Sequence, residues 1–477
     1  MSLEAGLIVR CRFAPAPSGS LHVGSAHTAL FNWLFARHHG GVFVLRVEDT
    51  DPERVVPGGI ESVQAALSWL GLDWDEGPGV EGPFGPYVET RRFHLHREVA
   101  HRFLEQDHAY RCYCTPEELA ERRRQQEARK EAPGYDGRCR RLTAAEREAF
   151  EAEGRPSAIR FAIPEGRDVA FTDLVKGEVR FANPDLRDFI ILRSDGTPTY
   201  LLASGIDDHL MEMTHVVRGE DLYPSTPRQI LMFEALGAAP PTYAHLPLIL
   251  GPDRAKLSKR HGAVAVEEFR DRGYLPEAMV NYLALLGWSP GGDEEVLPLE
   301  ELIRRFDLAA VSHHPSIFDV EKLTWLNGVY VRRLPPDELA ARLVAHLDGA
   351  AAADVVRAAV PLIQERMSTL AEAGELLRFL FEDVEPDQDA RKQIDTVDPE
   401  YLREAASGLE GVEQWTVEEI KGVLDDLAAG AGLNRTKGWQ PIRAAVTGRR
   451  ISPPLPESMQ LLGRERTVAR LRRAAGR

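Results

Sequence analysis

Two short motifs in this sequence contain residue types that suit the binding of phosphate groups. The first, HVGS at residues 22–25, follows a loop at residues 15–19 that is rich in proline and precedes an expected helix. N–H groups at the start of a helix favour an anion, His22 can donate a hydrogen bond to a phosphate oxygen, and Gly24 lets a nucleotide approach the backbone closely. A packed or helix-capping histidine would leave the same pattern, so this motif alone does not identify a site.

The second motif, KLSKR at residues 256–260, follows an expected strand and the polar loop at residues 251–255. Three cations on one loop suit a triphosphate, because phosphoryl and nucleotidyl transfer depend on positioning and on neutralising charge. A solvated basic loop is the alternative interpretation. The two motifs carry more weight together, since they lie at the ends of the two halves of one α/β pattern.

The elements that must hold these motifs alternate between strand and helix. Residues 7–13 indicate a strand, residues 25–39 a helix capped by Ser25, residues 42–47 a second strand and residues 59–70 a second helix. Parallel strands joined by a helix predict an α/β fold with a Rossmann-type doubly wound parallel sheet. Such sheets bind ligands beyond the carboxyl ends of their strands, which is where the first motif lies.

The α/β pattern is interrupted and then resumes. Between about residues 110 and 200, short β runs at 158–163, 178–182 and 189–193 predict an α+β insertion, with a capping box that begins at Thr115. The pattern resumes with a strand at 215–218, a helix opened by Thr226-Pro227 and a strand at 244–250. From about residue 335 the chain reads as successive helices, with another capping box at Thr416. We therefore expect an all-α C-terminal module and five segments, which are residues 1–105, 106–195, 196–262, 263–335 and 336–477.

Bulk composition limits the class of protein. The chain has 477 residues, 43% of them apolar, and a formal charge of −16, which by itself argues against a nucleic-acid partner. Between Arg435 and Arg477, however, there are eleven Lys or Arg against only Glu457 and Glu465. A polyanion could bind there, or the run could be a salt-bridged helical surface. The N-terminus lacks the apolar stretch of a signal peptide and no segment is long enough to span a membrane, so we expect a cytoplasmic protein without a membrane partner.

Three of the four cysteines form a candidate metal site. Cys112, Cys114 and Cys139 have a spacing that could hold zinc, whereas four cysteines in so long a chain do not make a disulfide framework. A structural zinc site requires four ligands, and no suitable residue follows Cys139 closely. Zinc therefore stays open against the alternative that the thiols pack as small hydrophobic groups.

The two phosphate-handling motifs, taken with the residues around them, resemble a known family. The PxPSG…HVG and KLSKR pair is similar to the HIGH and KMSKS signatures of class I aminoacyl-tRNA synthetases, in the forms of the bacterial glutamyl members. The resemblance is dense over residues 10–330 and weaker beyond, where it rests on segments 452–454 and 462–465. Further similar segments are Arg46 to Asp51, Tyr135 to Arg138, Pro198 to Tyr200, Asp207-Asp208, Arg218 to Asp221, Phe318-Asp319 and Trp325 to Asn327.

The resemblance implies a set of site residues. A glutamate substrate needs cations for its two carboxylates and an anion for its ammonium group, and arginine suits carboxylates. By resemblance, Arg12 faces the side chain, Glu48 the amino group, and Tyr200 and Arg218 the rest of the amino acid. The implied ATP-binding residues are Pro15, Ser18, Gly19, His22, Gly24 and Lys259, and the implied catalytic residues are His22, Lys256, Ser258, Lys259 and Arg260.

The resemblance also implies the reaction and its partners. The carboxylate of L-glutamate attacks the α-phosphate of ATP, which carries Mg²⁺, and the glutamyl group of the adenylate then passes to the terminal ribose of tRNA. Adenylate formation is expected only with tRNA bound. Residues 106–195 would bind the acceptor stem, residues 263–335 would contact the stem, and residues 336–477 would bind the anticodon. A monomer is expected.

Two departures from the family pattern and several alternatives accompany this interpretation. Ser25 stands where the motif usually ends in histidine, and Ser204 stands where some members have asparagine, so no substrate contact is assigned to Ser204. A glutaminyl member would carry PEPN-G at residues 15–19, a truncated tRNA-modifying relative would lack the helical module, and a small nucleotidyltransferase would not explain residues beyond 110. A tRNA-binding protein without activity would not need His22, Lys256 and Lys259. Whether glutamine tRNA is also charged stays open.

Overall fold

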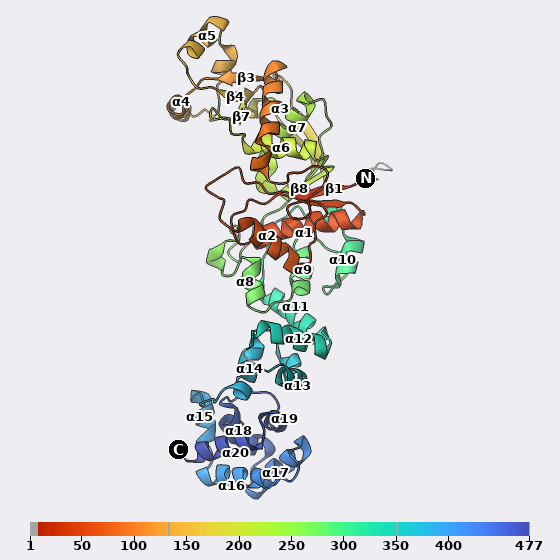
Figure 1. The fold of residues 1–477 in the computed structure, drawn as a ribbon, viewed down its shortest axis with the longest axis vertical. Helices are drawn as coiled ribbons and strands as arrows, with labels where there is room; N and C mark the ends of the chain where they lie inside the picture. Colours follow the sequence, from red (N-terminus) through yellow and green to blue (C-terminus); the bar gives the residue numbers. More distant parts are fainter. Residues whose placement is uncertain (1–7, 132–133, 350–351, 477) are drawn as a thin grey trace. The chain divides into compact units, whose positions relative to one another are not determined.

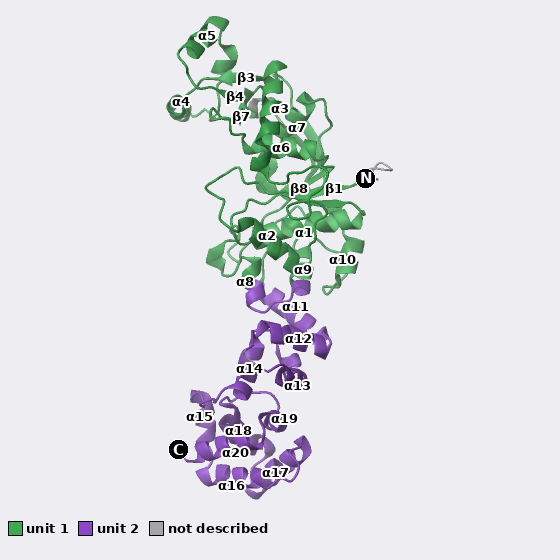
Figure 2. Ribbon diagram, viewed as in Figure 1, with its two compact units in different colours: residues 1–268, 279–319 green, residues 269–278, 320–477 purple. Residues whose placement is uncertain are grey.

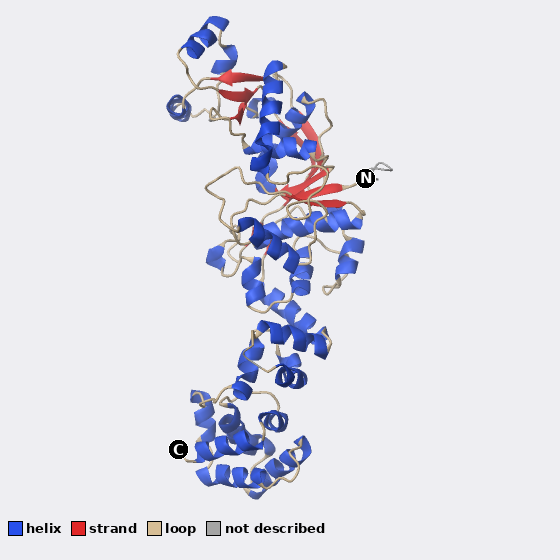
Figure 3. Ribbon diagram, viewed as in Figure 1, coloured by secondary structure: helices blue, strands red, loops and turns tan. Residues whose placement is uncertain are grey.

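The computed structural model describes residues 8–131, 134–349 and 352–476, and it divides the chain into two compact units. The first unit contains residues 1–268 and 279–319, and the second contains residues 269–278 and 320–477 (Figure 2). Strands occur in the first unit, whereas all regular elements among the described residues of the second are helices (Figure 3). None of the described helices is both long enough and apolar enough to cross a membrane.

The first half of the α/β fold is a strand, helix and strand. Strand β1 (Arg10–Phe13) pairs in parallel with β2 (Val42–Leu45), and helix α1 (Val23–His38) connects them. Eleven residues of α1 are buried, from Val23 to Ala36, so this helix is covered on most of its surface. The predicted helix start at Ser25 is wrong, because His22 caps α1 and Ser25 lies inside its first turn. The predicted strand extended to Leu7, which lies outside the described residues.

The second half adds another pair of parallel strands. Strand β8 (His215–Gly219) pairs in parallel with β9 (Thr242–Leu246), with helix α7 (Thr226–Ala235) between them. The two halves meet where Thr214 donates its N–H to the Arg10 carbonyl at 3.1 Å, and β1 lies beside β8 (Figure 1). This arrangement confirms the predicted α/β class. The single strand expected over 244–250 is instead two, β9 and β10 (Ile249–Leu250), because Pro247 between them cannot donate to a ladder.

The insertion is built from two groups of strands. Strands β3 (Ala109–Cys112), β4 (Ala158–Phe161) and β7 (Phe189–Leu192) form an antiparallel sheet in that order. The hairpin of β5 (Val169–Asp173) and β6 (Gly177–Phe181) instead extends the sheet of the second half, where Asp173 pairs with Tyr243 of β9. Strand β5 was not expected from the sequence, and through it the insertion reaches the central sheet.

Further helices lie between residues 59 and 305 of the chain. Helix α4 begins with the predicted capping box, in which Thr115 accepts from the Glu118 N–H and Glu118 accepts from the Thr115 N–H. A short strand, β11 (Ser316–Ile317), pairs with β10. The other helices up to residue 305 are α2 (Gly59–Trp69), α3 (Phe93–Glu105), α4 (Pro116–Ala128), α5 (Ala144–Ala152), α6 (Tyr200–Leu210), α8 (Val266–Asp271), α9 (Pro276–Ala284) and α10 (Leu299–Arg305).

The second unit is helical and has its own apolar core. Its buried side chains include Leu339, Val360 and Leu377, together with many small alanines that let the helices approach one another. Thr416 caps α17 by accepting from the Glu419 N–H at 3.4 Å, but Glu419 accepts from Gln414, so the expected reciprocal box is not formed. The helices are α11 (Val320–Arg333), α12 (Pro336–His346), α13 (Ala353–Ile363), α14 (Glu372–Phe381), α15 (Gln388–Ile394), α16 (Pro399–Glu410), α17 (Val417–Gly430), α18 (Arg435–Thr447), α19 (Leu455–Leu462) and α20 (Arg464–Ala475).

Candidate functional site

A cavity of about 390 Å³ lies beyond the carboxyl ends of β1 and β8 in the first unit. This is the edge at which open α/β sheets bind ligands. Its walls bring together most of the residues that the sequence singled out. Those that line it are Arg12, Pro15, Ser18, Gly19, His22, Gly24, Ser25, Glu48, Tyr200, Arg218 and Lys256, whereas Ser258, Lys259 and Arg260 do not.

The His22 ring is held at the helix start by one ring nitrogen, and it also contacts the Leu257 backbone of the KLSKR segment. Its Nδ1 accepts a hydrogen bond from the Gly24 N–H at 3.0 Å and so caps α1. Burial lowers the pKa of His22, and the nearby Lys256 charge lowers it further, although the Leu257 carbonyl opposes this. A neutral ring whose Nδ1 accepts carries its proton on Nε2, which can donate to an anion.

Two glycines are required by this local geometry. Gly19 has φ of +99°, a backbone conformation that side chains rarely adopt. A Cβ at Gly24 would lie 3.2 Å from Nδ1 of His22, so a side chain there would press on the capping ring. The proline-rich loop and the helix start are therefore shaped to keep the His22 ring in place.

The KLSKR segment contributes its first two residues to the cavity. Leu257 is buried, and its N–H donates to the Ile249 carbonyl at 3.1 Å, which fixes this part of the segment to β10. The Lys256 ammonium lies 3.7 Å from the Asp221 carboxylate, with 67% of its side chain exposed. Lys259 and Arg260 are also exposed, and Arg260 pairs with Asp253 at 3.0 Å. The structure thus presents an exposed cation, Lys256, at the cavity wall.

The part of the cavity that Arg12 and Glu48 line rests on a buried chain of charged side chains. The Arg12 Nε lies 2.9 Å from Asp208, which also pairs with Arg46 at 2.7 Å, and Arg46 pairs with Glu48 at 3.0 Å. Burial would raise the pKa of Asp208, but the charges of Arg12 and Arg46 hold it below its usual range. Burial would likewise lower the pKa of Arg46, but Asp208 and Glu48 raise it. Arg12 and Glu48, which both line the cavity, are therefore joined through Asp208 and Arg46.

Arg218 is in a different environment, because its contacts are neutral. Among the described residues, its guanidinium donates to His245 at 3.1 Å, to Gln229 at 2.8 Å and to Thr226 at 2.9 Å, and none of these is a carboxylate. Its side chain is 3% exposed. A buried cation without a contacting anion is costly, so this site is suited to an anionic ligand. Burial raises the pKa of nearby Tyr200, and the Glu48 charge adds to this, which keeps its hydroxyl able to donate.

Sequence reasoning missed the residues that support this site. Asp208 and Arg46 were noted only as parts of a resemblance, yet they connect Arg12 to Glu48. Ser204 contacts Arg46 at 3.4 Å through its hydroxyl and does not line the cavity. The available signal was a pair of adjacent aspartates, Asp207 and Asp208, in an otherwise apolar stretch of α6. Buried carboxylates need partners, and that pair predicts buried arginines.

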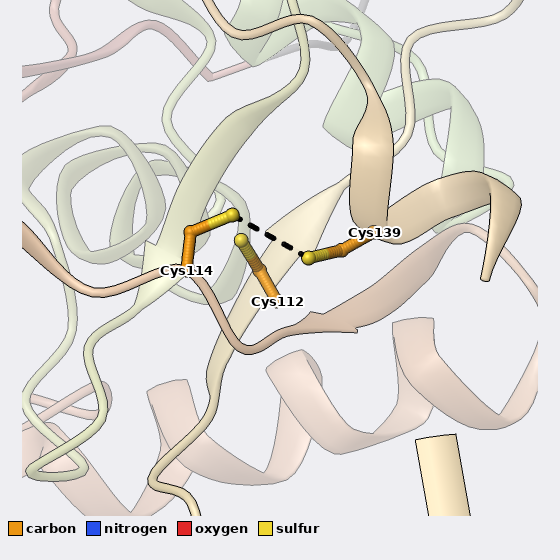
Figure 4. Close-up of side chains that lie close together, drawn as sticks. All are labelled: Cys112, Cys114 and Cys139. Carbon is orange, nitrogen blue, oxygen red and sulfur yellow. Dashed lines mark hydrogen bonds between the residues drawn. The ribbon is translucent and has the colours of Figure 1, made fainter. Parts of the chain in front are cut away.

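The three cysteines are brought together as the sequence predicted. Their sulfur atoms all lie within 4.8 Å of one another, and those of Cys114 and Cys139 lie 3.6 Å apart (Figure 4). The Tyr135 hydroxyl oxygen lies 3.5 Å from the Cys112 sulfur and 3.9 Å from the Cys114 sulfur. A phenol oxygen therefore lies beside the three sulfurs. Tyr135 precedes Cys139 in the chain, whereas the sequence pattern led us to expect a fourth ligand after Cys139.

A second cavity, of about 790 Å³, lies in the helical unit. Basic side chains line it, from Arg366, Lys437, Arg443 and Arg450, with polar and apolar residues between them. Burial lowers the pKa of Arg443, and the charge of Arg366 lowers it further. Two cations that face each other in this way attract a polyanion.

Other basic residues near the C-terminus are paired with acids. Arg435 pairs with Asp425 at 2.5 Å, Arg472 pairs with Glu410 at 2.5 Å, and Arg473 pairs with Asp383 at 2.8 Å. The salt-bridged surface that the sequence left open is therefore present over part of the basic run. Lys437, Arg443 and Arg450, which line the second cavity, belong to the other part of this run, whereas Arg366 precedes it.

Comparison with known proteins gives the family context of both units. The family model described as tRNA synthetases class I (E and Q), catalytic domain, matches residues 8–325, and a model described as an anticodon binding domain matches residues 338–475. A glutamate–tRNA ligase of Moorella thermoacetica is 47% identical, and the alignment covers 98% of each chain. A glutamate–tRNA ligase of Symbiobacterium thermophilum is 45% identical over 98% of this chain and 99% of the relative.

Solved structures are similar over the same length. A glutamate tRNA ligase of Elizabethkingia meningosepticum, crystallised in complex with its amino acid, aligns with a TM-score of 0.87 at 34% identity. That alignment covers 98% of this chain and 99% of the other. A glutamate–tRNA synthetase of Elizabethkingia anophelis aligns with a TM-score of 0.86 at 34% identity, over 99% and 100% of the two chains.

Proposed function

The chain belongs to the family of class I tRNA synthetases for glutamate and glutamine, and we infer from this that it joins L-glutamate to tRNA in an ATP-dependent reaction. The chemistry follows from the family. The glutamate α-carboxylate attacks the α-phosphate of ATP, which releases diphosphate and forms glutamyl-adenylate. A ribose hydroxyl at the end of tRNA then attacks the mixed anhydride, which releases AMP and gives glutamyl-tRNA.

One observation supports this function best. A single cavity is lined at one side by His22, Gly24 and Lys256 and at the other by Arg12, Glu48 and Arg218. The first group suits phosphates, because a ring N–H, a helix N-terminus and an exposed ammonium favour an anion. The second group suits an amino acid with two carboxylates and an ammonium. Holding both reactants in one cavity gives the proximity on which transfer to phosphorus depends.

We assign roles to the residues on this basis. His22 and the lysines of KLSKR stabilise the negative charge on the pentavalent phosphate, and Mg²⁺ arrives on the phosphates of ATP. Arg12 faces the side-chain carboxylate of glutamate, Glu48 the ammonium, and Tyr200 and Arg218 the rest of the amino acid. Since Lys259 and Arg260 are exposed, they would act only after the segment moves onto bound ATP.

The remaining segments are proposed to bind tRNA. Residues 106–195 would bind the acceptor stem, residues 263–335 would contact the stem, and residues 336–477 would bind the anticodon. Within the last segment, the basic groove lined by Arg366, Lys437, Arg443 and Arg450 is the part we assign to the anticodon loop. Its volume and its cations suit unpaired nucleotides and their phosphates.

The cysteine cluster is proposed to hold a structural zinc ion. Three sulfurs and the Tyr135 oxygen are close enough together to surround one ion, and thiolate sulfur is a donor that suits zinc. The cluster joins β3 to the segment before α5, so an ion there would stabilise the insertion. The chain is further proposed to act as a monomer in the cytoplasm.

The test is glutamate-dependent exchange of diphosphate into ATP in the presence of cognate tRNA, followed by charging of purified tRNA species with labelled glutamate. Exchange with glutamate alone among the amino acids is expected. No exchange with any amino acid would contradict the proposal and favour a tRNA-binding protein without activity. The charging assay also decides whether glutamine tRNA is a substrate.

A further inference from the structure

Two buried residues stand behind Arg218 and do not line the cavity. His245 lies opposite Arg218 in the parallel register of β8 and β9, and its Nε2 lies 3.1 Å from the Arg218 Nε. On the other side of the ring, His245 Nδ1 lies 2.6 Å from an Asp173 carboxylate oxygen. The exposed fractions of Asp173, His245 and Arg218 are 1%, 0% and 3%.

The donors and acceptors in this row are fixed by Arg218. A guanidinium N–H can only donate, so His245 Nε2 must accept, and the single proton of the neutral ring must lie on Nδ1. Nδ1–H then donates to Asp173. Burial lowers the pKa of His245, and the charge of Arg218 lowers it further against the pull of Asp173, which agrees with a neutral ring.

Asp173 is itself held rigidly. One of its carboxylate oxygens accepts from the Val175 N–H and from the Lys176 N–H, both at 2.9 Å, at the turn between β5 and β6. The same oxygen accepts from the His245 N–H at 3.3 Å. The insertion thus supplies the carboxylate that orients a histidine of the central sheet.

This arrangement fixes Arg218 without neutralising it by direct contact. Three of its five N–H groups are used by His245, Gln229 and Thr226, and one on each terminal nitrogen has no partner among the described residues. Arg12, by contrast, shares the Asp208 carboxylate with Arg46. If a carboxylate touched Arg218 directly, a neutral ligand would satisfy the site almost as well as an anion.

We propose that His245 and Asp173 are positioning residues that hold Arg218 for a ligand carboxylate and so set the affinity of the site for glutamate. The proposal rests on the assignment of Arg218 to glutamate binding made above. His245 supplies the acceptor, and Asp173 keeps the ring proton on the nitrogen that faces away from Arg218. A change in either residue should act on glutamate and leave ATP unaffected.

The experiment compares His245→Phe, His245→Gln and Asp173→Asn in the full-length enzyme with cognate tRNA. Phenylalanine keeps the ring but leaves the Arg218 Nε–H without an acceptor, so the KM for glutamate should rise roughly ten- to a hundredfold. Glutamine restores an acceptor oxygen and should bring the KM back to within about fivefold of wild type. Asparagine at 173 can donate to Nδ1, which moves the ring proton to Nε2, so the KM should rise about tenfold.

A further readout separates positioning from general damage. The KM for ATP should stay within about twofold of the wild-type value in all three variants, whereas the KM for glutamate should change as described. The proposal is overturned if His245→Phe leaves the KM for glutamate unchanged. It is also overturned if the KM values for glutamate and ATP rise together in His245→Phe and His245→Gln does not bring the KM for glutamate back towards the wild-type value.

Two design features keep the outcome interpretable. If His245→Phe does not fold, Asp173→Asn and His245→Gln together still test the proposal. Asp173→Asn moves the ring proton to the nitrogen that faces Arg218, whereas His245→Gln keeps an acceptor for Arg218. Wild-type enzyme is assayed in parallel. Failure of the wild-type enzyme to charge tRNA with glutamate would contradict the proposed function itself. If the wild-type enzyme charges tRNA normally and the variants show the same KM for glutamate, only the positioning proposal is contradicted.

Discussion

The guanidinium of Arg46 and the carboxylate of Asp208 lie 2.7 Å apart, N to O, with 0% and 2% of their side chains exposed. Asp208 also binds Arg12 at 2.9 Å, and Arg46 also binds Glu48 at 3.0 Å. The two residues assigned to opposite charges of the amino acid are therefore connected through a pair that never touches the cavity. Removing one member leaves a buried charge without a partner, and this loses more free energy of folding than the intact pair contributes.

We predict that Asp208→Asn destabilises the first unit by about 3–5 kcal/mol, because Arg12 and Arg46 lose their shared anion. Chemical denaturation followed by the fluorescence of the first unit measures this. Asp389→Asn is a matched control, since Asp389 is exposed and pairs with Lys392 on the surface of the second unit. Equal stability of Asp208→Asn and wild type would contradict the buried network.

The same pair predicts a dependence on pH. The folded pKa of Asp208 is held low, so its stabilising contribution is fully present above the unfolded value of about 3.9 and is lost as pH falls through the folded pKa. The difference in unfolding free energy between wild type and Asp208→Asn should therefore narrow below about pH 4. A difference that widens on acidification would contradict this sign.

Lys256→Ala and Lys259→Ala should each lower the rate of glutamate-dependent diphosphate exchange, because each removes a cation that is assigned to the phosphates. We expect a loss of roughly ten- to a thousandfold for each variant. The affinity for tRNA, measured by filter binding, should change little. Lys421→Ala, an exposed lysine of α17, is the control and should keep full activity. A drop in tRNA affinity without a drop in exchange would mean that these lysines bind tRNA instead.

Glu89 is a fully buried carboxyl group beside this network. Burial and then the charge of Glu48 raise the pKa of Glu89 to about 9, so it is protonated in the folded protein at neutral pH. A group whose folded pKa is raised binds a proton more tightly when folded, so stability falls as pH rises from the unfolded value of about 4.3 towards 9.

Glu89→Gln should therefore raise the free energy of unfolding at pH 7 by roughly 1–3 kcal/mol and flatten its decline between pH 5 and 9. Thermal unfolding across this range measures both effects. Glu98→Gln, an exposed position on α3, is the control and should change neither. An unchanged decline between pH 5 and 9 in Glu89→Gln would show instead that the carboxyl is already ionised in the folded protein.

Local sequence patterns were enough to predict the motifs, but not the distant residues that contact them in the fold. The strands that flank the first motif, the helix after it and the cluster of Cys112, Cys114 and Cys139 could be predicted, because each depends on nearby residues. The helix start was misplaced to Ser25, since a histidine ring can cap a helix through Nδ1 and sequence rules favour serine. The contact of Asp173 with His245 joins residues far apart in the chain, so no spacing rule could reveal it.

The cysteine cluster should hold about one zinc ion per chain when the protein is purified without chelator. Elemental analysis by mass spectrometry gives the content, and less than a tenth of an equivalent would contradict the site. Cys114→Ser should remove most of the metal, because its sulfur lies 3.6 Å from that of Cys139. Cys11→Ser, a buried thiol in β1 far from the cluster in sequence, should keep the metal. Tyr135→Phe tests whether the phenol oxygen completes the site.

The basic groove of the helical unit should decide tRNA affinity. Arg366→Ala and Lys437→Ala should each raise the KM for tRNA roughly three- to thirtyfold, because each removes one cation from the groove that we assign to the anticodon loop. The KM for glutamate should not change, since both residues belong to the second unit and the residues that we assign to glutamate belong to the first. Arg472→Ala is the matched control, because this arginine is paired with Glu410 and does not line the groove.

A higher salt concentration should weaken tRNA binding of the wild-type enzyme more than that of Arg366→Ala, because the variant releases one fewer counterion on binding. If Arg366→Ala and Arg472→Ala behaved alike, the groove would have no special role, and the anticodon would bind elsewhere on the helical unit.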